Sequence, residues 1–204
     1  MTKIKLCGLS QLRDIEIANQ LAPEYVGFVF AGLSKRYVSP EQAGRLKKHL
    51  NPSITAVGVF VNETPEEISK LLNLKIIDMA QLHGQEDEDY IKALRSLTDK
   101  PIIKAFAINT EEDVIDANKS TADYVLLDSG NGGSGRVFDW VYAKGLLRPY
   151  FLAGGLSLNN IDRAIKTLGP YAVDVSSGIE TDGQKDIDKM GKFVHIVRGK
   201  DEIK

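Results

Sequence analysis

The sequence predicts an α/β fold in which eight parallel strands close into a single (βα)8 barrel. Eight short runs rich in β-branched and aromatic residues alternate with longer stretches in which apolar residues have helical spacing. Over 204 residues this gives roughly 25 residues for each strand and its helix, a usual length for such a unit. An open nucleotide-binding sheet would carry a glycine-rich loop after its first strand, but the turn at residues 7–10 reads CGLS. The count of eight therefore favours a TIM barrel at the short end of its size range.

The predicted strands are apolar along nearly their whole length. Barrel strands are covered by helices on one face and by the barrel interior on the other, so continuous apolar runs are expected. In chain order, the runs occupy residues 4–7, 25–30, 54–61, 76–82, 101–107, 124–128, 150–153 and 172–175.

Helices are predicted between these strands from apolar stripes and from start signals. The clearest stripe covers residues 161–168, and similar stripes occur at 187–197 and 68–72. Ser39-Pro40 and Thr64-Pro65 each place a capping residue before a proline at the first helical position. Gln42 and Glu67 follow the two caps by three residues, which predicts capping boxes without a chemical role.

The composition excludes several classes of protein. Hydrophobic residues make up 43% of the chain and charged residues 26%, as in soluble globular proteins. The net charge of −2 supplies no basic field for nucleic acid. One cysteine excludes a disulfide framework within the chain, and the apolar runs fall far short of the roughly 20 residues of a membrane span.

The organisation of the chain predicts one domain over residues 1–204, ending in a charged tail at residues 199–204. No linker or block of like charge divides the sequence. The N-terminus runs straight into a strand and has no apolar signal segment, so we expect a cytoplasmic protein.

Candidate chemical groups stand where the strands end, because barrel enzymes place their chemistry there. Cys7 is either an inert buried thiol or, beside a positive group, a reactive thiolate. Asp128 is followed by an irregular stretch, which favours a proton donor in a desolvated site over a helix cap. Arg36 is either a solvated surface residue or a clamp for a carboxylate. His83 could pack, cap a helix or contact a substrate, and the residue type does not decide among these.

Two turns that contain glycine follow the seventh and eighth strands. They are Gly154-Gly155 and Ser176-Ser177-Gly178, and Asp174 lies just before the second one. Glycine lets backbone N–H groups approach an anion closely, and barrels often bind a substrate phosphate at this place. Each turn alone is most simply a tight turn, but the pair favours a phosphate site.

Eight sequence strings at these positions occur in a fixed order. They are residues 5–9 (KLCGL), 26–30 (VGFVF), 34–40 (SKRYVSP), 57–62 (VGVFVN), 81–84 (QLHG), 132–140 (GGSGRVFDW), 153–156 (AGGL) and 174–180 (DVSSGIE). Together they resemble the phosphoribosylanthranilate isomerase family, which acts in tryptophan biosynthesis. The family's usual KICG reads KLCG here and its usual GGTG reads GGSG, and neither change removes a functional group.

The resemblance implies an isomerase that catalyses a cofactor-free Amadori rearrangement. The substrate would be N-(5-phosphoribosyl)anthranilate and the product 1-(2-carboxyphenylamino)-1-deoxyribulose 5-phosphate. Asp128 would be the general acid that protonates the furanose ring oxygen, and Cys7 the general base that removes the proton from sugar C2. Arg36 would contact the anthranilate carboxylate, and Asp174 and His83 would lie near the substrate. The phosphate would be bound by Gly154, Gly155, Ser176, Ser177 and Gly178.

The expected partner is thus a small phosphorylated molecule, with no metal, cofactor, nucleic acid or membrane, and with the protein as a monomer or homodimer. A metal-dependent sugar-phosphate epimerase would need several His and Asp ligands at strand ends, where only His83 is so placed among the histidines. The histidine-pathway aminoaldose isomerase resembles a duplicated half-barrel, and this chain shows no such repeat. A non-catalytic phosphate-binding module would have no need of both Cys7 and Asp128.

Overall fold

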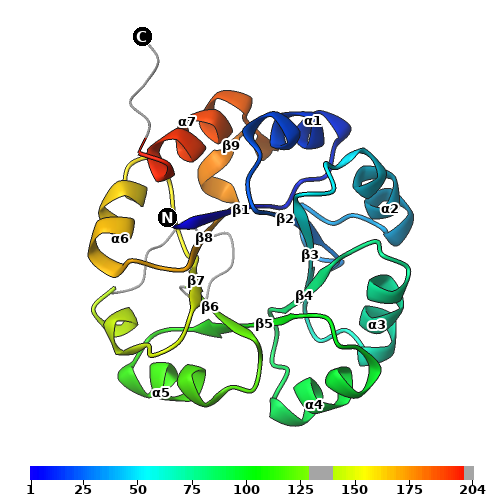
Figure 1. Cartoon of the computed structure of the whole chain (residues 1–204), viewed down its shortest axis with the longest axis vertical. Helices are drawn as coiled ribbons and strands as arrows, with labels where there is room; N and C mark the ends of the chain where they lie inside the picture. The colour runs from blue at the N-terminus through cyan, green and yellow to red at the C-terminus, as the bar shows by residue number, and fades with distance from the viewer. Residues whose placement is uncertain (129–139, 200–204) are drawn as a thin grey trace.

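A closed barrel of eight parallel strands forms the centre of the computed structural model, which describes residues 1–128 and 140–199. Neighbouring strands pair in sequence order, and the last strand pairs with the first (Figure 1). This confirms the predicted (βα)8 barrel. The strands are β1 (Lys3–Cys7), β2 (Tyr25–Val29), β3 (Thr55–Phe60), β4 (Met79–Leu82), β5 (Ile102–Ala107), β6 (Tyr124–Asp128), β7 (Tyr150–Leu152) and β8 (Ala172–Val175).

Helices surround the barrel in the ring that Figure 1 shows. They are α1 (Leu12–Leu21), α2 (Pro40–His49), α3 (Pro65–Asn73), α4 (Glu88–Leu97), α5 (Glu111–Lys119), α6 (Ile161–Leu168) and α7 (Ile187–Val197). Within residues 140–149, the connection from β6 to β7 contains a 3₁₀ turn, η1 (Tyr142–Gly145), in place of an α-helix. The predicted irregular stretch after Asp128 and the string at 132–140, apart from Trp140, lie outside the described residues. So does the predicted tail, apart from Gly199.

Two details of the sequence prediction were wrong. Strand β4 begins three residues later than predicted, because Ile76 donates its backbone N–H to the Leu71 carbonyl and so still belongs to the turn that ends α3. The reciprocal half of each predicted capping box is also replaced, since the Thr64 backbone N–H donates to the Glu63 carboxylate and not to Glu67. Ser39 and Thr64 do accept backbone N–H groups as N-caps, but the Gln42 side chain donates to the Ser10 carbonyl instead.

A short antiparallel hairpin after β8 was not predicted. It consists of β9 (Glu180–Thr181) and β10 (Gln184–Lys185), preceded by a 3₁₀ turn, η2 (Ser177–Ile179). Asp182 and Gly183 connect its strands with φ angles of 52° and 75°. Two positive φ angles at an Asp-Gly pair are the signature of a type I′ hairpin turn, so the sequence did carry a signal for it.

Successive side chains along a strand point alternately into the barrel and toward the helices, which determines the residues that line the barrel interior. Residues two apart share a face of a strand, so Lys5 and Cys7 of β1 both point inward, and so do Gln81 and His83 at the end of β4. Leu6 and its counterparts on the other face pack in the main apolar core against the helices.

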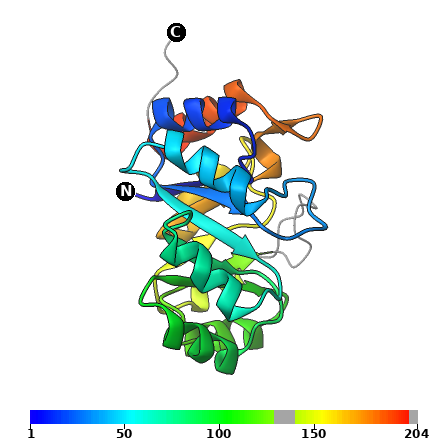
Figure 2. The ribbon, with the colours of Figure 1, turned by 90° about the vertical axis from the view of Figure 1, so that its right-hand side faces the viewer.

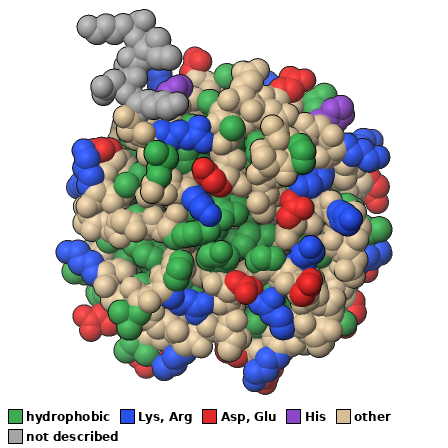
Figure 3. All heavy atoms as spheres, in the orientation of Figure 1, with side chains coloured by type: hydrophobic (Ala, Val, Ile, Leu, Met, Phe, Trp, Pro, Cys, Tyr) green, Lys and Arg blue, Asp and Glu red, His purple; other side chains and the backbone are tan. Residues whose placement is uncertain are grey.

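Aromatic rings close the end of the barrel at which the strands begin. Tyr25 and Tyr124 meet the Phe151 ring edge-on at centroid distances of 5.3 and 5.7 Å, and Tyr124 stacks on Tyr171 at 5.1 Å. Figure 3 shows hydrophobic side chains gathered at the centre of this face, ringed by charged ones. The loops that follow the strands lie at the other end, away from the N-terminus (Figure 2). A ligand must therefore enter the barrel from the carboxyl ends of the strands.

Candidate active site

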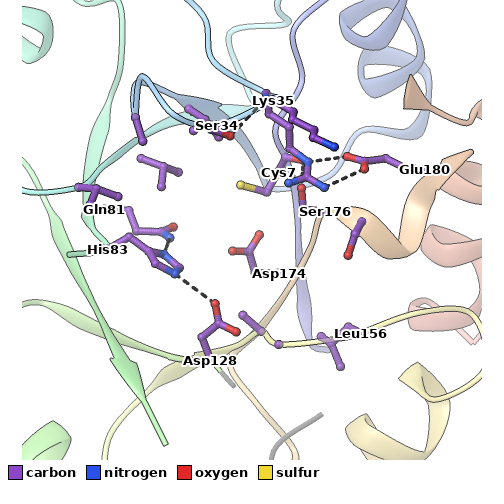
Figure 4. Close-up of a pocket in the computed structure, with 18 of the residues that line it drawn as sticks. Cys7, Ser34, Lys35, Gln81, His83, Asp128, Leu156, Asp174, Ser176 and Glu180 are labelled. Atoms are coloured by element: carbon purple, nitrogen blue, oxygen red, sulfur yellow. Dashed lines mark hydrogen bonds and ion pairs between the residues drawn. The ribbon is translucent and has the colours of Figure 1, made fainter. Parts of the chain in front are cut away.

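A cavity of about 710 Å³ opens at the carboxyl ends of the strands. Most of the predicted site residues line it, namely Cys7, Arg36, His83, Asp128, Gly154, Gly155, Asp174, Ser176 and Ser177 (Figure 4). Gly178 is not among the lining residues. A Cβ atom there would lie 2.0 Å from the Leu156 carbonyl oxygen, so the absence of a side chain lets the turns after β7 and β8 pack together.

Cys7 lies inside the barrel beside a buried ion pair. The pairing of β1 with β8 sets Lys5 opposite Asp174, and the Lys5 ammonium is 3.0 Å from Asp174 Oδ2 with no exposed surface. Burial raises the pKa of the Cys7 thiol, while the positive charges of Lys5 and Lys185 oppose that shift. Space for the thiol comes from Gly27 on the neighbouring strand, where a Cβ atom would lie 2.6 Å from Sγ. The sequence thus builds a buried thiol whose thiolate has cations close by.

Asp174 has one carboxylate oxygen without a hydrogen-bond partner among the described residues. This oxygen is the buried Oδ1, whereas Oδ2 accepts a hydrogen bond from Lys5. Figure 4 shows the carboxyl group between Cys7 and Asp128 in the cavity. A buried acceptor without a donor is costly, so this oxygen is suited to a hydroxyl or amine of a ligand.

Asp128 ends β6 and is linked to β4 by hydrogen bonds. Its Oδ2 lies 3.1 Å from His83 Nε2, and His83 Nδ1 lies 2.8 Å from the side-chain amide nitrogen of Gln81. Asp128 is 8% exposed and Gln81 is 1% exposed, while the His83 side chain between them is 27% exposed to the cavity.

Arg36 makes a two-pronged ion pair with Glu180. Its Nε is 2.7 Å from Glu180 Oε1 and its Nη2 is 2.8 Å from Oε2, while Lys185 lies 2.6 Å from Oε1. Burial alone would raise the pKa of Glu180, but hydrogen bonds from Arg36 and Lys185 outweigh this and hold the pKa below its ordinary value. The arginine stem crosses Gly8, where a Cβ atom would lie 2.5 Å from Cδ, and φ is +78°. With respect to the residues that the structure describes, this side-on pairing leaves Nη1 and the second Nη2 hydrogen available to another carboxylate.

Sequence reasoning missed four polar residues of this site. Lys5, Gln81, Glu180 and Lys185 were not assigned any role, although each contacts a predicted site residue. For Lys5 and Gln81 a signal was available, because each stands two residues before a candidate and so shares its face of the strand. The signal for Glu180 and Lys185 was the Asp-Gly turn between them.

The described residues contain neither a membrane-spanning helix nor a cluster of metal ligands. No helix within 1–128 or 140–199 is both long and apolar enough to cross a lipid bilayer. Over those same ranges, no three His, Cys, Asp or Glu side chains cluster in a way that could hold a metal ion.

The closed barrel and the polar cavity at its carboxyl end define a (βα)8-barrel enzyme. Comparison with known proteins narrows this class. The chain belongs to the N-(5'-phosphoribosyl)anthranilate isomerase family, whose model matches residues 4–196. The expected resemblance is therefore confirmed, and the activity is that of an isomerase in tryptophan biosynthesis.

Individual relatives agree over nearly the whole chain. The N-(5'-phosphoribosyl)anthranilate isomerase of Endomicrobium trichonymphae is 45% identical over 202 residues, covering 97% of this chain and 99% of its own. The crystal structure from Thermotoga maritima has a TM-score of 0.87 at 37% identity and covers 98% of this chain and 100% of its own. A second structure, with a TM-score of 0.84 at 35% identity and the same coverage, is a complex with reduced 1-(o-carboxyphenylamino)-1-deoxyribulose 5-phosphate. The Thermotoga maritima enzyme is described as dimeric.

Proposed function

We propose that this enzyme converts N-(5-phosphoribosyl)anthranilate to 1-(2-carboxyphenylamino)-1-deoxyribulose 5-phosphate by general acid and base catalysis. The observation that carries the mechanism is that Cys7 and Asp128 face one cavity from β1 and β6, with Asp174 between them. The relative solved with a reduced form of this product supports the choice of substrate. Turnover by the purified protein, followed through the fluorescence of the anthranilate group, tests the proposal.

The proton transfers assign one role to each side chain. Asp128 gives its proton to the furanose ring oxygen, the C–O bond at C1 breaks, and the substrate nitrogen becomes an iminium. Cys7, as the thiolate, takes the proton from C2, and the electron pair of that bond neutralises the iminium to form an enolamine. The enolamine gains a proton at C1 and loses one from the C2 hydroxyl, which gives the ketone and balances the proton count. The iminium itself accepts the electrons.

Binding of the substrate is assigned to groups around this pair. The free end of the Arg36 guanidinium would hold the anthranilate carboxylate, with Glu180 fixing its direction. Asp174 Oδ1 would accept a hydrogen bond from a sugar hydroxyl. Backbone N–H groups of the turns at 154–155 and 176–178 would hold the phosphate, and Gly154 and Gly155 adopt φ angles of 77° and 66° there. His83 would form a hydrogen bond with Asp128 during the reaction, as it does in the structure.

Replacing Arg36 by Met should weaken substrate binding more than it slows the chemistry. The anthranilate carboxylate keeps its charge throughout the reaction, so a clamp on it binds ground and transition states alike. We expect KM to rise at least about tenfold, as for the loss of a charged hydrogen bond, with kcat changed much less. Lys35→Met, at the neighbouring position on the same cavity, is the matched control for loss of charge. A large fall in kcat at unchanged KM would contradict the assignment of Arg36.

A second prediction concerns the phosphate site. Inorganic phosphate should compete weakly with substrate, and Gly155→Asp should raise its inhibition constant by adding like charge. Gly155→Asn is the matched control, because Asp and Asn both tolerate the left-handed backbone while only Asp is charged. Gly178→Asp is unsuitable, since it would collide with the Leu156 carbonyl. Equal inhibition constants for wild type and Gly155→Asp would place the anion elsewhere.

The remaining expectations stay predictions from the sequence. These are a single domain, a cytoplasmic location, a lack of nucleic-acid binding and a monomeric or homodimeric state. Size-exclusion chromatography with light scattering would decide the last of these.

A further inference from the structure

Gln81 is buried and His83 is partly buried, and together they form a chain of hydrogen bonds that ends on Asp128. The Gln81 amide nitrogen is 2.8 Å from His83 Nδ1, and His83 Nε2 is 3.1 Å from Asp128 Oδ2. Gln81 and His83 point inward together because they are two residues apart at the end of β4. Figure 4 shows the three side chains along one side of the cavity.

The amide nitrogen of Gln81 decides where the imidazole carries its proton. An amide NH₂ can only donate, so His83 Nδ1 must accept and cannot itself be protonated. A neutral imidazole then has its hydrogen on Nε2, which faces Asp128 as a donor.

The orientation of the Gln81 amide follows from the cost of burying its other atom. In the structure, Oε1 is buried and has no hydrogen-bond partner among the described residues. Turning the amide over would place the NH₂ group at that buried position, which exchanges an unpaired carbonyl oxygen for an additional unpaired N–H group. Orphaned buried N–H groups are rarer than under-satisfied carbonyl oxygens, so the observed orientation is the favourable one.

We propose that Gln81 is a positioning residue that holds His83 as the neutral Nε2–H tautomer, so that His83 donates to Asp128 and does not take its proton. This inference rests on the proposed role of Asp128 as the acid. The proton of Asp128 then has the substrate ring oxygen as its acceptor. The carboxylate left behind is stabilised by the hydrogen bond from His83, which favours the transfer.

The direct readout is the tautomer of His83, measured by nitrogen NMR on protein labelled with ¹⁵N-histidine at neutral pH. The chain has three histidines, and His83→Asn identifies the signal of interest by its loss. We expect the Nε2–H tautomer in wild type. In Gln81→Glu, a carboxylate accepts from Nδ1, so protonation of Nδ1 is expected. An Nδ1–H tautomer in wild type would overturn the proposal, whatever the activity.

Kinetics test whether the tautomer matters for turnover. Gln81→Glu should lower kcat about 10- to 100-fold, the size of effect known for groups that orient a metal-bound imidazole, with KM changed less than about twofold. Gln81→Met, which removes the donor without adding charge, should also lower kcat and should leave the tautomer mixed. If one variant fails to fold, the other supplies the comparison.

A double-mutant comparison separates action through His83 from a structural effect. In a His83→Asn background, Gln81→Glu should cause no further loss of kcat, because the group it acts on is gone. An equal loss in both backgrounds would contradict the proposal. Failure of the proposed acid role of Asp128 would give a different result. The Asp128→Asn variant would then have a normal kcat, while the NMR spectrum would still show the Nε2–H tautomer of His83.

Discussion

Replacing Asp128 by Asn is expected to lower kcat about 10²- to 10⁴-fold, the usual cost of losing a positioned proton donor. Asn keeps the shape of the side chain, and its carbonyl can still accept from His83 Nε2, which is 3.1 Å from Asp128 Oδ2. It cannot give a proton to the ring oxygen, so ring opening loses its acid. KM should change little, because the substitution leaves the cavity and its cations in place.

The control for this variant is Asp182→Asn, which makes the same chemical change at the exposed turn beside the cavity mouth. Asn also tolerates the left-handed backbone at that turn, so wild-type kcat is expected there. Initial rates from anthranilate fluorescence, with circular dichroism to check folding, provide the measurement. If Asp128→Asn kept kcat within about threefold of wild type, another group would have to be the acid.

Replacing Cys7 by Ala is expected to have an effect of similar size, about 10²- to 10⁴-fold in kcat, because no base then takes the C2 proton. Cys7→Ser is the matched control for shape. The hydroxyl ionises far less readily than a thiol, so Cys7→Ser should resemble Cys7→Ala. Near-normal kcat in either variant would place the base elsewhere.

The pH dependence of Cys7 can be followed directly. Burial raises the pKa of its thiol, so the protonated form should dominate at neutral pH and the thiolate should increase as pH rises. Cys7 is the one cysteine in the chain, so no other thiol contributes to the rate of alkylation by iodoacetamide. The pH dependence of that rate therefore follows the ionisation of Cys7. We expect that rate to keep rising well into the alkaline range. The residual turnover of Asp128→Asn, in which the acid no longer titrates, should rise with pH in parallel. A plateau below neutral pH would contradict the raised pKa.

The architecture was open to prediction because each strand is a separate apolar run with turn residues beside it. The sixth and eighth strands, Tyr124–Asp128 and Ala172–Val175, were predicted at both ends. The start of β4 was not, because the turn that ends α3 contains Ile76 and Ile77, which look like the strand that follows.

The site was harder to predict than the fold, because its contacts join distant parts of the chain. Because Cys7 and Asp128 each stand at the end of a predicted strand, the sequence predicted that they lie at the active site. Their roles as base and acid were inferred from the family resemblance. Nothing local shows that Lys5 meets Asp174, since barrel closure brings β1 and β8 together across 169 residues of sequence. Glu180 reaches Arg36 through a hairpin with strands of two residues each, too short for a periodic pattern.

The central claim is that Cys7 and Asp128 work as a base and acid pair on one bound phosphoribosylanthranilate. The most direct test is the initial rate of anthranilate fluorescence change with N-(5-phosphoribosyl)anthranilate, measured side by side for wild type, Cys7→Ala, Asp128→Asn and the double variant. We predict turnover by wild type and a loss of about 10²- to 10⁴-fold in each single variant. The double variant should lose much less than the product of the two, as for groups that act as a unit. The claim would be contradicted if the wild type showed no turnover, or if the double variant kept a kcat within about tenfold of the wild-type value.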